Sequence, residues 1–225
     1  RWFFLGHDYK VSRDVLVPRP ETEVLVIETI AAMDAVNGAP RLGAEIGLGS
    51  GIISIELLSK FPTLRMVATE VSDKALEIAK SNSRDILGEA RSLSLAALLV
   101  PGEGSPVREL GEAARTRGFD PGAFDFLVSN PPYLDPKRAG DEVEDDVLRN
   151  EPHVALFGPA EDVLHFYRDM AGGAAYLLKP EGFVAVEIPH ERADEIAALF
   201  SAAGWTPRLI ADLTGRNRVI LARKG

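Results

Sequence analysis

A glycine-rich stretch that begins at Glu45 combines residue types and spacing that could bind a nucleotide-like ligand. It follows one predicted strand and opens a predicted helix, where glycines allow a tight turn and a close approach of backbone to ligand. The spacing is Gly-x-Gly-x-Gly, whereas a dinucleotide fingerprint is Gly-x-Gly-x-x-Gly, and Ile52 stands where its third glycine belongs. The candidate cofactor-binding residues in this stretch are Glu45, Gly47, Leu48, Gly49, Ser50 and Gly51.

Glu70 and Val71, at the end of the next predicted strand, are expected to complete this cofactor site. A carboxylate at that place in a doubly wound fold can accept hydrogen bonds from both ribose hydroxyls. Glu45 suits either a methionine-like zwitterion or the N–H groups of the loop itself. Together these features favour S-adenosylmethionine over NAD. The alternative interpretation is a structural glycine turn, with Glu70 as a solvated strand end.

The tetrad Asn130-Pro131-Pro132-Tyr133 is the second stretch that could do chemistry. Prolines have no N–H, so their carbonyls remain as acceptors, and the Asn130 side chain adds an acceptor and a donor. The Asn130 oxygen and the Pro131 carbonyl could hold both N–H groups of a planar NH₂ and direct its nitrogen toward a methyl donor. Tyr133 is expected to pack on the planar face. The predicted substrate-binding residues are Asn130, Pro131, Pro132 and Tyr133, with Asn130, Pro131 and Tyr133 as catalytic residues; the alternative is a strand ended by a proline turn.

Alternating strand-like and helix-like segments must position these two stretches. Strands are predicted at 42–46, 65–71, 124–129 and 182–188, and helices at 52–61, 73–87, 160–178 and 191–203. Segments 208–213 and 218–222 flank a Gly/Asn turn and predict an antiparallel hairpin. The pattern predicts an α/β fold with a doubly wound, mostly parallel sheet. Ligands bind at the carboxyl ends of the strands in such a sheet, where both stretches fall.

The predicted organisation is one domain preceded by a lead-in. Residues 1–36 are expected to form an arm and a helix, with Pro20 and Thr22 as start signals, and residues 37–225 the domain that carries both stretches. The glycine- and proline-rich segment 101–122 is interpreted as an inserted loop. Because Arg1 is followed directly by three aromatic residues, we expect that a preceding segment has been removed.

Composition and charge narrow the classes of function. Hydrophobic residues make up 46% and charged residues 26% of the 225, as in folded globular proteins, and there is no cysteine for a thiolate metal site or nucleophile. Lys and Arg number 25 against 34 Asp and Glu, a net charge of −9, which argues against duplex nucleic acid as the main partner. No apolar run approaches the roughly 20 residues of a membrane span, and the four His are scattered. We therefore expect no direct DNA binding, no membrane, no metal, and a cytoplasmic location.

The segment Val15-Leu16-Val17-Pro18-Arg19-Pro20-Glu21-Thr22-Glu23 resembles the "IPRPETE" segment of the HemK/PrmC family, the peptide chain release factor glutamine methyltransferases. Three later stretches resemble the same family: Asn150-Glu151-Pro152 with Ala155-Leu156, Val186-Glu187-Ile188, and 212–219. Together with the glycine loop and the tetrad, the resemblance runs from about Trp2 to the end of the chain.

The resemblance implies the seven-stranded, Rossmann-like sheet of a class I methyltransferase. It also implies methyl transfer from S-adenosylmethionine to the N5 side-chain amide nitrogen of the glutamine in a release factor's Gly-Gly-Gln loop, leaving S-adenosylhomocysteine. The resemblance assigns cofactor binding to Gly47, Gly49, Gly51 and Glu70. It assigns binding of the substrate amide to Asn130, Pro131 and Tyr133, and it places Asn130 near the methionine part of the cofactor as well. The resemblance also implies an N-terminal helical domain, which we expect to have preceded this segment.

The chain departs from the family pattern in three places. Leu48 stands where Thr or Ser is usual, Glu45 where Asp is usual, and segment 91–100 contains no carboxylate for the usual contact beside the adenine. The insert that follows is a candidate substitute. Arg19 and Glu21 either close over the substrate or cap the first helix.

Three alternative functions remain open from the sequence. The tetrad also fits adenine-N6 DNA methyltransferases, against which the net charge and the lack of a target recognition domain argue. A ribosomal protein glutamine methyltransferase is the second alternative, although such enzymes usually depart from Arg-Pro-Glu-Thr-Glu. A catalytically impaired cofactor-binding protein is the third, because of the altered adenine segment.

Overall fold

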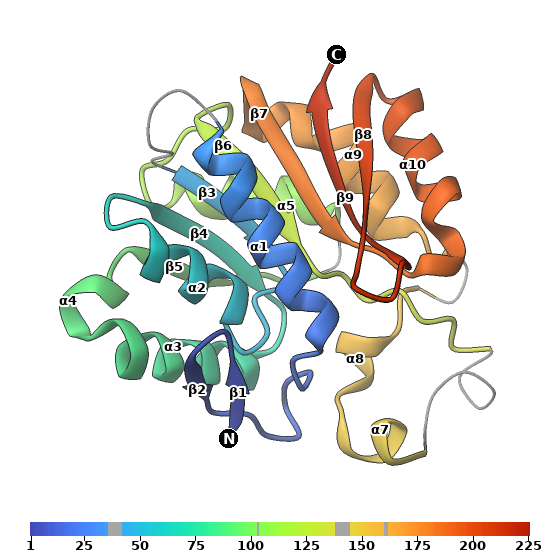
Figure 1. The fold of residues 1–225 in the computed structure, drawn as a ribbon. Coiled ribbons are helices and arrows are strands. Elements are labelled where there is room, and N and C mark those ends of the chain that lie inside the picture. The colour runs from blue at the N-terminus through green and yellow to red at the C-terminus, as the bar shows by residue number, and fades with distance from the viewer. Residues whose placement is uncertain (36–41, 103, 138–144, 160–161) are drawn as a thin grey trace.

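The computed structural model of the chain describes residues 1–35, 42–102, 104–137, 145–159 and 162–225 (Figure 1). In this part of the chain a seven-stranded sheet has the order β5-β4-β3-β6-β7-β9-β8. The strands from β5 to β7 run parallel, and β9 is antiparallel to both of its neighbours. The predicted fold class is therefore confirmed. In sheet order the strands are β5 Leu95–Leu99, β4 Arg65–Glu70, β3 Leu42–Ile46, β6 Phe124–Ser129, β7 Leu178–Glu187, β9 Asn217–Lys224 and β8 Trp205–Ala211.

Helices cover both faces of the sheet (Figure 1). On one face pack α1 (Pro20–Asp34), α2 (Ile52–Lys60) and α3 (Asp73–Leu87), and on the other pack α5 (Pro106–Arg115), α9 (His165–Leu177) and α10 (Ala193–Ala202). The central strands are buried on both faces, as a doubly covered parallel sheet requires; every residue of β3 is buried. The remaining described helices are short: α4 Glu89–Ser92, α7 Asp145–Asn150, α8 His153–Leu156 and the 3₁₀ turn His190–Arg192.

The lead-in packs onto this sheet. Helix α1 begins with Pro20 at its first position and buries Leu25, Val26 and Met33 in the cluster that contains Phe126 and Phe183. Before it, β1 (Trp2–Phe4) and β2 (His7–Tyr9) form a small antiparallel hairpin that the sequence did not predict. The expected boundary between residues 36 and 37 lies outside the described residues.

The interpretation of segment 101–122 as a loop is wrong over residues 106–115, which form α5. The Ser105 side chain accepts a hydrogen bond from the Arg108 N–H and caps the helix, and Val107, Leu110 and Ala114 are buried on one face. Gly111 lies on the same face, where an added Cβ would come within 2.7 Å of Tyr176. The glycine that suggested a loop is therefore there for helix packing.

Other element boundaries shift by a few residues. Helix α9 begins at His165, five residues after the predicted start, and residues 160 and 161 are outside the described part. Strand β7 begins at Leu178 and β8 at Trp205, both earlier than predicted. Helix α3 and strands β3 and β6 have the predicted bounds.

Candidate active site

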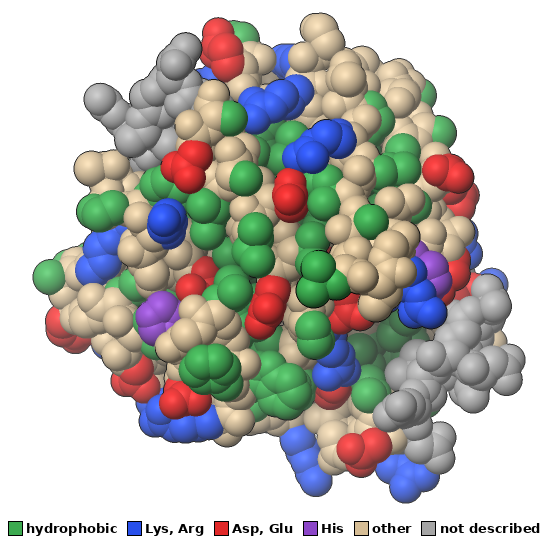
Figure 2. Space-filling model, viewed as in Figure 1, with side chains coloured by type: hydrophobic (Ala, Val, Ile, Leu, Met, Phe, Trp, Pro, Cys, Tyr) green, Lys and Arg blue, Asp and Glu red, His purple; other side chains and the backbone are tan. Residues whose placement is uncertain are grey.

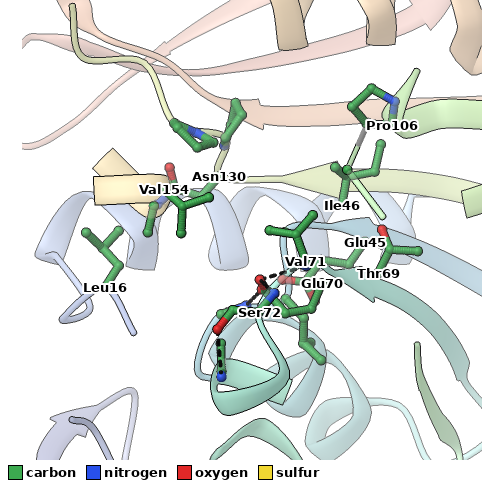
Figure 3. Close-up of a pocket in the computed structure, with 18 of the residues that line it drawn as sticks. Leu16, Glu45, Ile46, Thr69, Glu70, Val71, Ser72, Pro106, Asn130 and Val154 are labelled. Carbon is green, nitrogen blue, oxygen red and sulfur yellow. Dashed lines mark hydrogen bonds between the residues drawn. The ribbon is translucent and has the colours of Figure 1, made fainter. Parts of the chain in front are cut away.

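A cavity of about 450 Å³ opens at the carboxyl ends of β3, β4 and β6 (Figure 3). In Figure 3, Asn130 and Val154 lie on the opposite side of it from Glu70, Val71 and Ser72. Both stretches singled out in the sequence therefore face one crevice, as expected at this edge of a parallel sheet. The predicted site residues that line the cavity are Glu45, Gly47, Leu48, Gly49, Ser50, Glu70, Val71, Asn130, Pro131 and Pro132.

The glycine loop is held by hydrogen bonds inside the protein. The N–H groups of Gly47 and Leu48 both donate to the Thr69 carbonyl at 3.0 Å, and the Gly49 N–H donates to Glu70 Oε2 at 2.8 Å. Gly49 has φ +55°, a left-handed conformation that favours glycine, and an added Cβ would point into open space. A pyrophosphate is bound mainly by such N–H donors, so their internal use argues against a dinucleotide.

Gly51 has a different role from the other two glycines of the loop. It does not line the cavity, and an added Cβ would lie 3.0 Å from Ile55 and 3.2 Å from Ala79. Gly51 therefore lets the start of α2 pack closely against α3, and its contribution to the site is the shape of the turn.

Glu70 is a buried acceptor at the end of β4, with 8% of its surface exposed. Its Oε2 accepts from the Gly49 N–H, and its Oε1 accepts from the N–H groups of Val71 at 2.9 Å and Ser72 at 3.0 Å. This position excludes the alternative of a solvated strand end. The carboxylate ties the glycine loop to the turn after β4, and it keeps lone pairs for a ligand hydroxyl because each oxygen can accept more than one bond.

Glu45 lies at the base of the same wall and is 1% exposed. Its Oε2 accepts from the backbone N–H and the hydroxyl of Ser54, whereas no donor in the described part of the chain reaches Oε1. Burial raises the pKa of this carboxyl to about 8, and the nearby Glu70 adds to the rise. A cationic ligand in the cavity would stabilise the ionised form of Glu45.

The charges around the cavity favour a cation. Four carboxyl groups line it, from Asp14, Glu45, Glu70 and Glu109, and among its described lining residues there is no Lys or Arg. Glu109, on α5, accepts from the N–H groups of Gly102 and Gly104 and is the carboxylate that the insert brings to this wall. An S-adenosylmethionine, with its sulfonium and ammonium charges, fits such a lining better than a dianionic dinucleotide.

The tetrad continues directly from β6, which the Ser129 hydroxyl ties to the Ile46 carbonyl of β3. The Asn130 side chain donates from Nδ2 to Thr22 Oγ1 at 3.2 Å, and Thr22 in turn donates to Glu187 Oε2 at 2.7 Å. The expected placement of Tyr133 differs from the structure: its ring packs against the core beside α9 and does not line the cavity. Burial, with Glu187 nearby, raises the pKa of Tyr133 well above its usual range.

The lead-in residues Arg19 and Glu21 form ion pairs and do not cap α1 with their side chains. Arg19 pairs with Glu151 at 2.6 Å, and Glu21 pairs with Arg218 at 3.3 Å. Sequence reasoning missed the part of Thr22 and Glu187 in the site, although both lie in segments that resembled the family. No local signal could link them, because they are 165 positions apart.

The described residues contain neither a membrane-spanning helix nor a cluster of metal ligands. None of the helices there combines the length and apolar character needed to cross a membrane. In the same residues, no group of three or more His, Asp or Glu is placed to hold a metal ion.

Comparison with known proteins identifies relatives over almost the whole chain, although no model of a protein family matches it. A release factor glutamine methyltransferase from Caulobacter vibrioides is 35% identical over 216 residues, covering 96% of this chain and 68% of the relative. A release factor glutamine methyltransferase from Moorella thermoacetica is 36% identical over 221 residues, covering 97% of this chain and 71% of the relative.

A solved structure agrees with these relatives. It is a release factor-specific protein-(glutamine-N5) methyltransferase from Alicyclobacillus acidocaldarius, with a TM-score of 0.54 and 26% identity, covering 93% of this chain and 95% of the other. On sequence identity over nearly its whole length, this chain belongs to the family of release factor glutamine methyltransferases.

Proposed function

We propose that this chain transfers a methyl group from S-adenosylmethionine to the side-chain amide nitrogen of a glutamine in a peptide chain release factor. The observation that carries the proposal is that Asn130 and Pro131, two adjacent residues with hydrogen-bond acceptors, line one acid-lined cavity with the glycine loop and Glu70. Family membership supports the same reaction. A substrate of the translation machinery places the reaction in the cytoplasm.

The residues of the cavity fit S-adenosylmethionine. Glu70 would accept from ribose hydroxyls, and Glu45 would balance the ammonium or sulfonium charge with its unpartnered Oε1. The adenine would be enclosed by Val71, Val100, Pro101, Gly102, Gly104 and Pro106. The open space beside Gly47 and Gly49 leaves room for the ligand against the backbone. When bound, this cofactor supplies an electrophilic methyl group on a positively charged sulfur.

The tetrad orients the nucleophile. An amide nitrogen is a poor nucleophile because its lone pair is delocalised, so positioning supplies much of the catalysis. Asn130 Oδ1 and the Pro131 carbonyl would each accept one N–H of the glutamine NH₂ and stabilise the positive charge that grows on nitrogen. The nitrogen would gain the methyl group as the methyl–sulfur bond breaks and its electron pair stays on sulfur. The alkylated nitrogen is acidic and would give one proton to water, so the reaction needs no strong base. Pro132 would keep the peptide chain at this turn rigid.

The surface charge favours a protein substrate over duplex DNA. On the face shown in Figure 2, Lys and Arg side chains are interspersed with Asp and Glu and do not gather into one basic patch. Residues 37–225 would carry both binding sites, and the lead-in of residues 1–36 would contribute Thr22 to the substrate side.

The test is methyl transfer with a labelled donor. The chain is incubated with labelled S-adenosylmethionine and a purified release factor, and the label is located by mass spectrometry. Label on the glutamine of the Gly-Gly-Gln loop is expected, and a matched factor with that glutamine replaced by asparagine should stay unlabelled. Label on DNA adenine or on a ribosomal protein would overturn the proposal. Binding of S-adenosylmethionine without transfer to any of these would identify a catalytically impaired cofactor-binding protein.

A further inference from the structure

Two buried side chains are linked to Asn130 by hydrogen bonds, and one of them, Thr22, also lines the cavity. Thr22 lies in the first turn of α1, Glu187 ends β7, and each is only 2% exposed. The three side chains form a chain of hydrogen bonds, Asn130 Nδ2 to Thr22 Oγ1 at 3.2 Å and Thr22 Oγ1 to Glu187 Oε2 at 2.7 Å. Buried polar groups of this kind restrict one another's orientation.

The count of donors and acceptors in this chain decides which way the Asn130 amide faces. A hydroxyl has one hydrogen, and Thr22 gives it to the Glu187 carboxylate. Its oxygen can then only accept from Asn130, so the NH₂ of Asn130 must face Thr22. The other end of the carboxamide, Oδ1, is thereby left for a different partner. An acceptor is what a substrate NH₂ requires there.

The Thr22 hydroxyl is not needed by its own helix. The N-cap of α1 is Arg19, which makes no side-chain cap hydrogen bond, and the backbone N–H of Thr22 donates to the Arg19 carbonyl. Formation of α1 therefore does not require the hydrogen bond between Thr22 and Glu187. That buried contact to β7 must serve something other than the helix.

We propose that Thr22 and Glu187 are positioning residues for methyl transfer, which hold the Asn130 carboxamide with Oδ1 turned toward the substrate amide. The inference rests on the proposed function. Both act through Asn130: Glu187 accepts the hydrogen of Thr22, and together the two residues hold the NH₂ end of the Asn130 amide. If Thr22 no longer donated its hydrogen to Glu187, the Asn130 carboxamide could rotate. Its NH₂ would then face the NH₂ of the substrate amide, which would have no acceptor for its hydrogens.

Protonation of Glu187 would release the hydrogen of Thr22. The charged and titratable groups around its carboxyl are Glu21 on α1, Arg218 on β9, Tyr133 after β6 and Tyr167 on α9. Burial raises the pKa of Glu187 to about 7, and Glu21 adds to the rise, while hydrogen bonds from Thr22 and Asn130 and the charge of Arg218 oppose it. Below that pH the carboxyl becomes a donor to Thr22, so turnover should fall as the pH is lowered from 8 to 6.

The experiment compares Thr22→Val, Thr22→Ser and Glu187→Gln, with Thr29→Val as the matched control. Thr29 is also buried on α1, but its hydroxyl donates to the Leu25 carbonyl of its own helix. For each variant, kcat and KM for the release factor are measured from pH 6 to 8, with S-adenosylmethionine affinity measured by calorimetry. Thr22→Val keeps the volume and removes the hydroxyl, so kcat should fall about 10- to 100-fold with cofactor affinity within about 2-fold of the parent.

The conservative variants separate positioning from a structural role. Thr22→Ser restores the hydroxyl and should recover kcat to within about 5-fold, as should Thr29→Val. Glu187→Gln keeps a carbonyl acceptor but cannot titrate, so it should remain active at pH 8 and lose the fall in kcat below about pH 7. The proposal is overturned if Thr22→Val turns over like the parent, if it loses cofactor affinity in proportion to kcat, or if Glu187→Gln keeps the parental pH profile. A parent chain with no transfer to a release factor would instead refute the proposed function, and the positioning role with it.

Discussion

The two walls of the cavity are built in different ways. On the wall proposed to bind the cofactor, the cofactor wall, Glu70 accepts from Gly49 and Glu45 accepts from Ser54, pairs that are 21 and 9 residues apart in the chain. On the wall proposed to bind the substrate, the substrate wall, Asn130 donates to Thr22 and Thr22 to Glu187, pairs that are 108 and 165 residues apart. One wall is a local motif, and the other exists only when α1, β6 and β7 have packed together. Changes on the first should therefore affect ligand affinity, and changes on the second turnover.

The largest expected effect is on the substrate wall, with Asn130→Ala. Loss of one aligned polar partner in the transition state should lower kcat by roughly 10²-fold or more, while cofactor affinity stays near that of the parent. Asn130→Asp keeps an acceptor but removes the NH₂ that donates to Thr22, so turnover should stay strongly reduced with near-normal cofactor affinity. Steady-state kinetics and calorimetry check both. An equal loss of kcat and cofactor affinity would break the division between the walls.

The next effect is on the cofactor wall, with Gly49→Val. A valine at φ +55° is strained, and its side chain would occupy the open space against the loop. We expect the affinity for S-adenosylmethionine to fall at least about 100-fold, about 3 kcal/mol. Gly204→Val is the matched control, because Gly204 has φ +85° and open space around it but does not line the cavity. It should lower thermal stability and leave the affinity unchanged; a similar affinity loss in both variants would count against a specific role for Gly49.

Glu70→Ala should have a smaller effect on the same wall. The change removes acceptors for ribose hydroxyls and for three loop N–H groups, so cofactor affinity should weaken by about 1–3 kcal/mol. Glu70→Gln retains one carbonyl oxygen as an acceptor, so its affinity for the cofactor should fall less than that of Glu70→Ala. Calorimetry that finds unchanged affinity in the alanine variant would remove Glu70 from the site.

The same contrast explains how much the sequence could predict. The segment from Leu42 to Glu70 was predicted nearly as observed, because its strands are apolar runs and its turns are marked by glycine and proline. Helix α5 was missed because Gly111 in a helix is explained only by its neighbour Tyr176. The hairpin of β1 and β2 carries no turn signal beyond Leu5-Gly6, and Leu5 takes the unusual φ of +43°.

The candidate site divides in the same way. The predicted cofactor residues were named from the residue types, their spacing and their place after predicted strands, and all but Gly51 line the cavity. The tetrad was found as a motif, but the motif could not reveal that Tyr133 packs into the core or that Thr22 and Glu187 support Asn130. Those contacts join distant segments, and only packing determines them.

The smallest expected effect is the pH dependence that Glu45, on the cofactor wall, gives to stability and to cofactor affinity. The pKa of Glu45 is raised from 4.5 in the unfolded chain to about 8 in the folded chain, so its contribution to stability is fully present below about pH 4.5 and is lost as the pH rises to 8. Relaxation and solvent access reduce the loss to about 1–2 kcal/mol. Glu45→Gln cannot ionise, so relative to the parent it should gain stability between pH 5 and 8, as measured by urea unfolding at each pH. Glu187 titrates in both proteins, so the difference in their stability at each pH reports on Glu45 alone.

A cationic cofactor favours ionised Glu45, so the affinity of the parent for S-adenosylmethionine should rise between pH 5 and 8, whereas the affinity of Glu45→Gln should not. If affinity and stability changed in the same direction with pH, Glu45 would not be the group that balances the cofactor's charge.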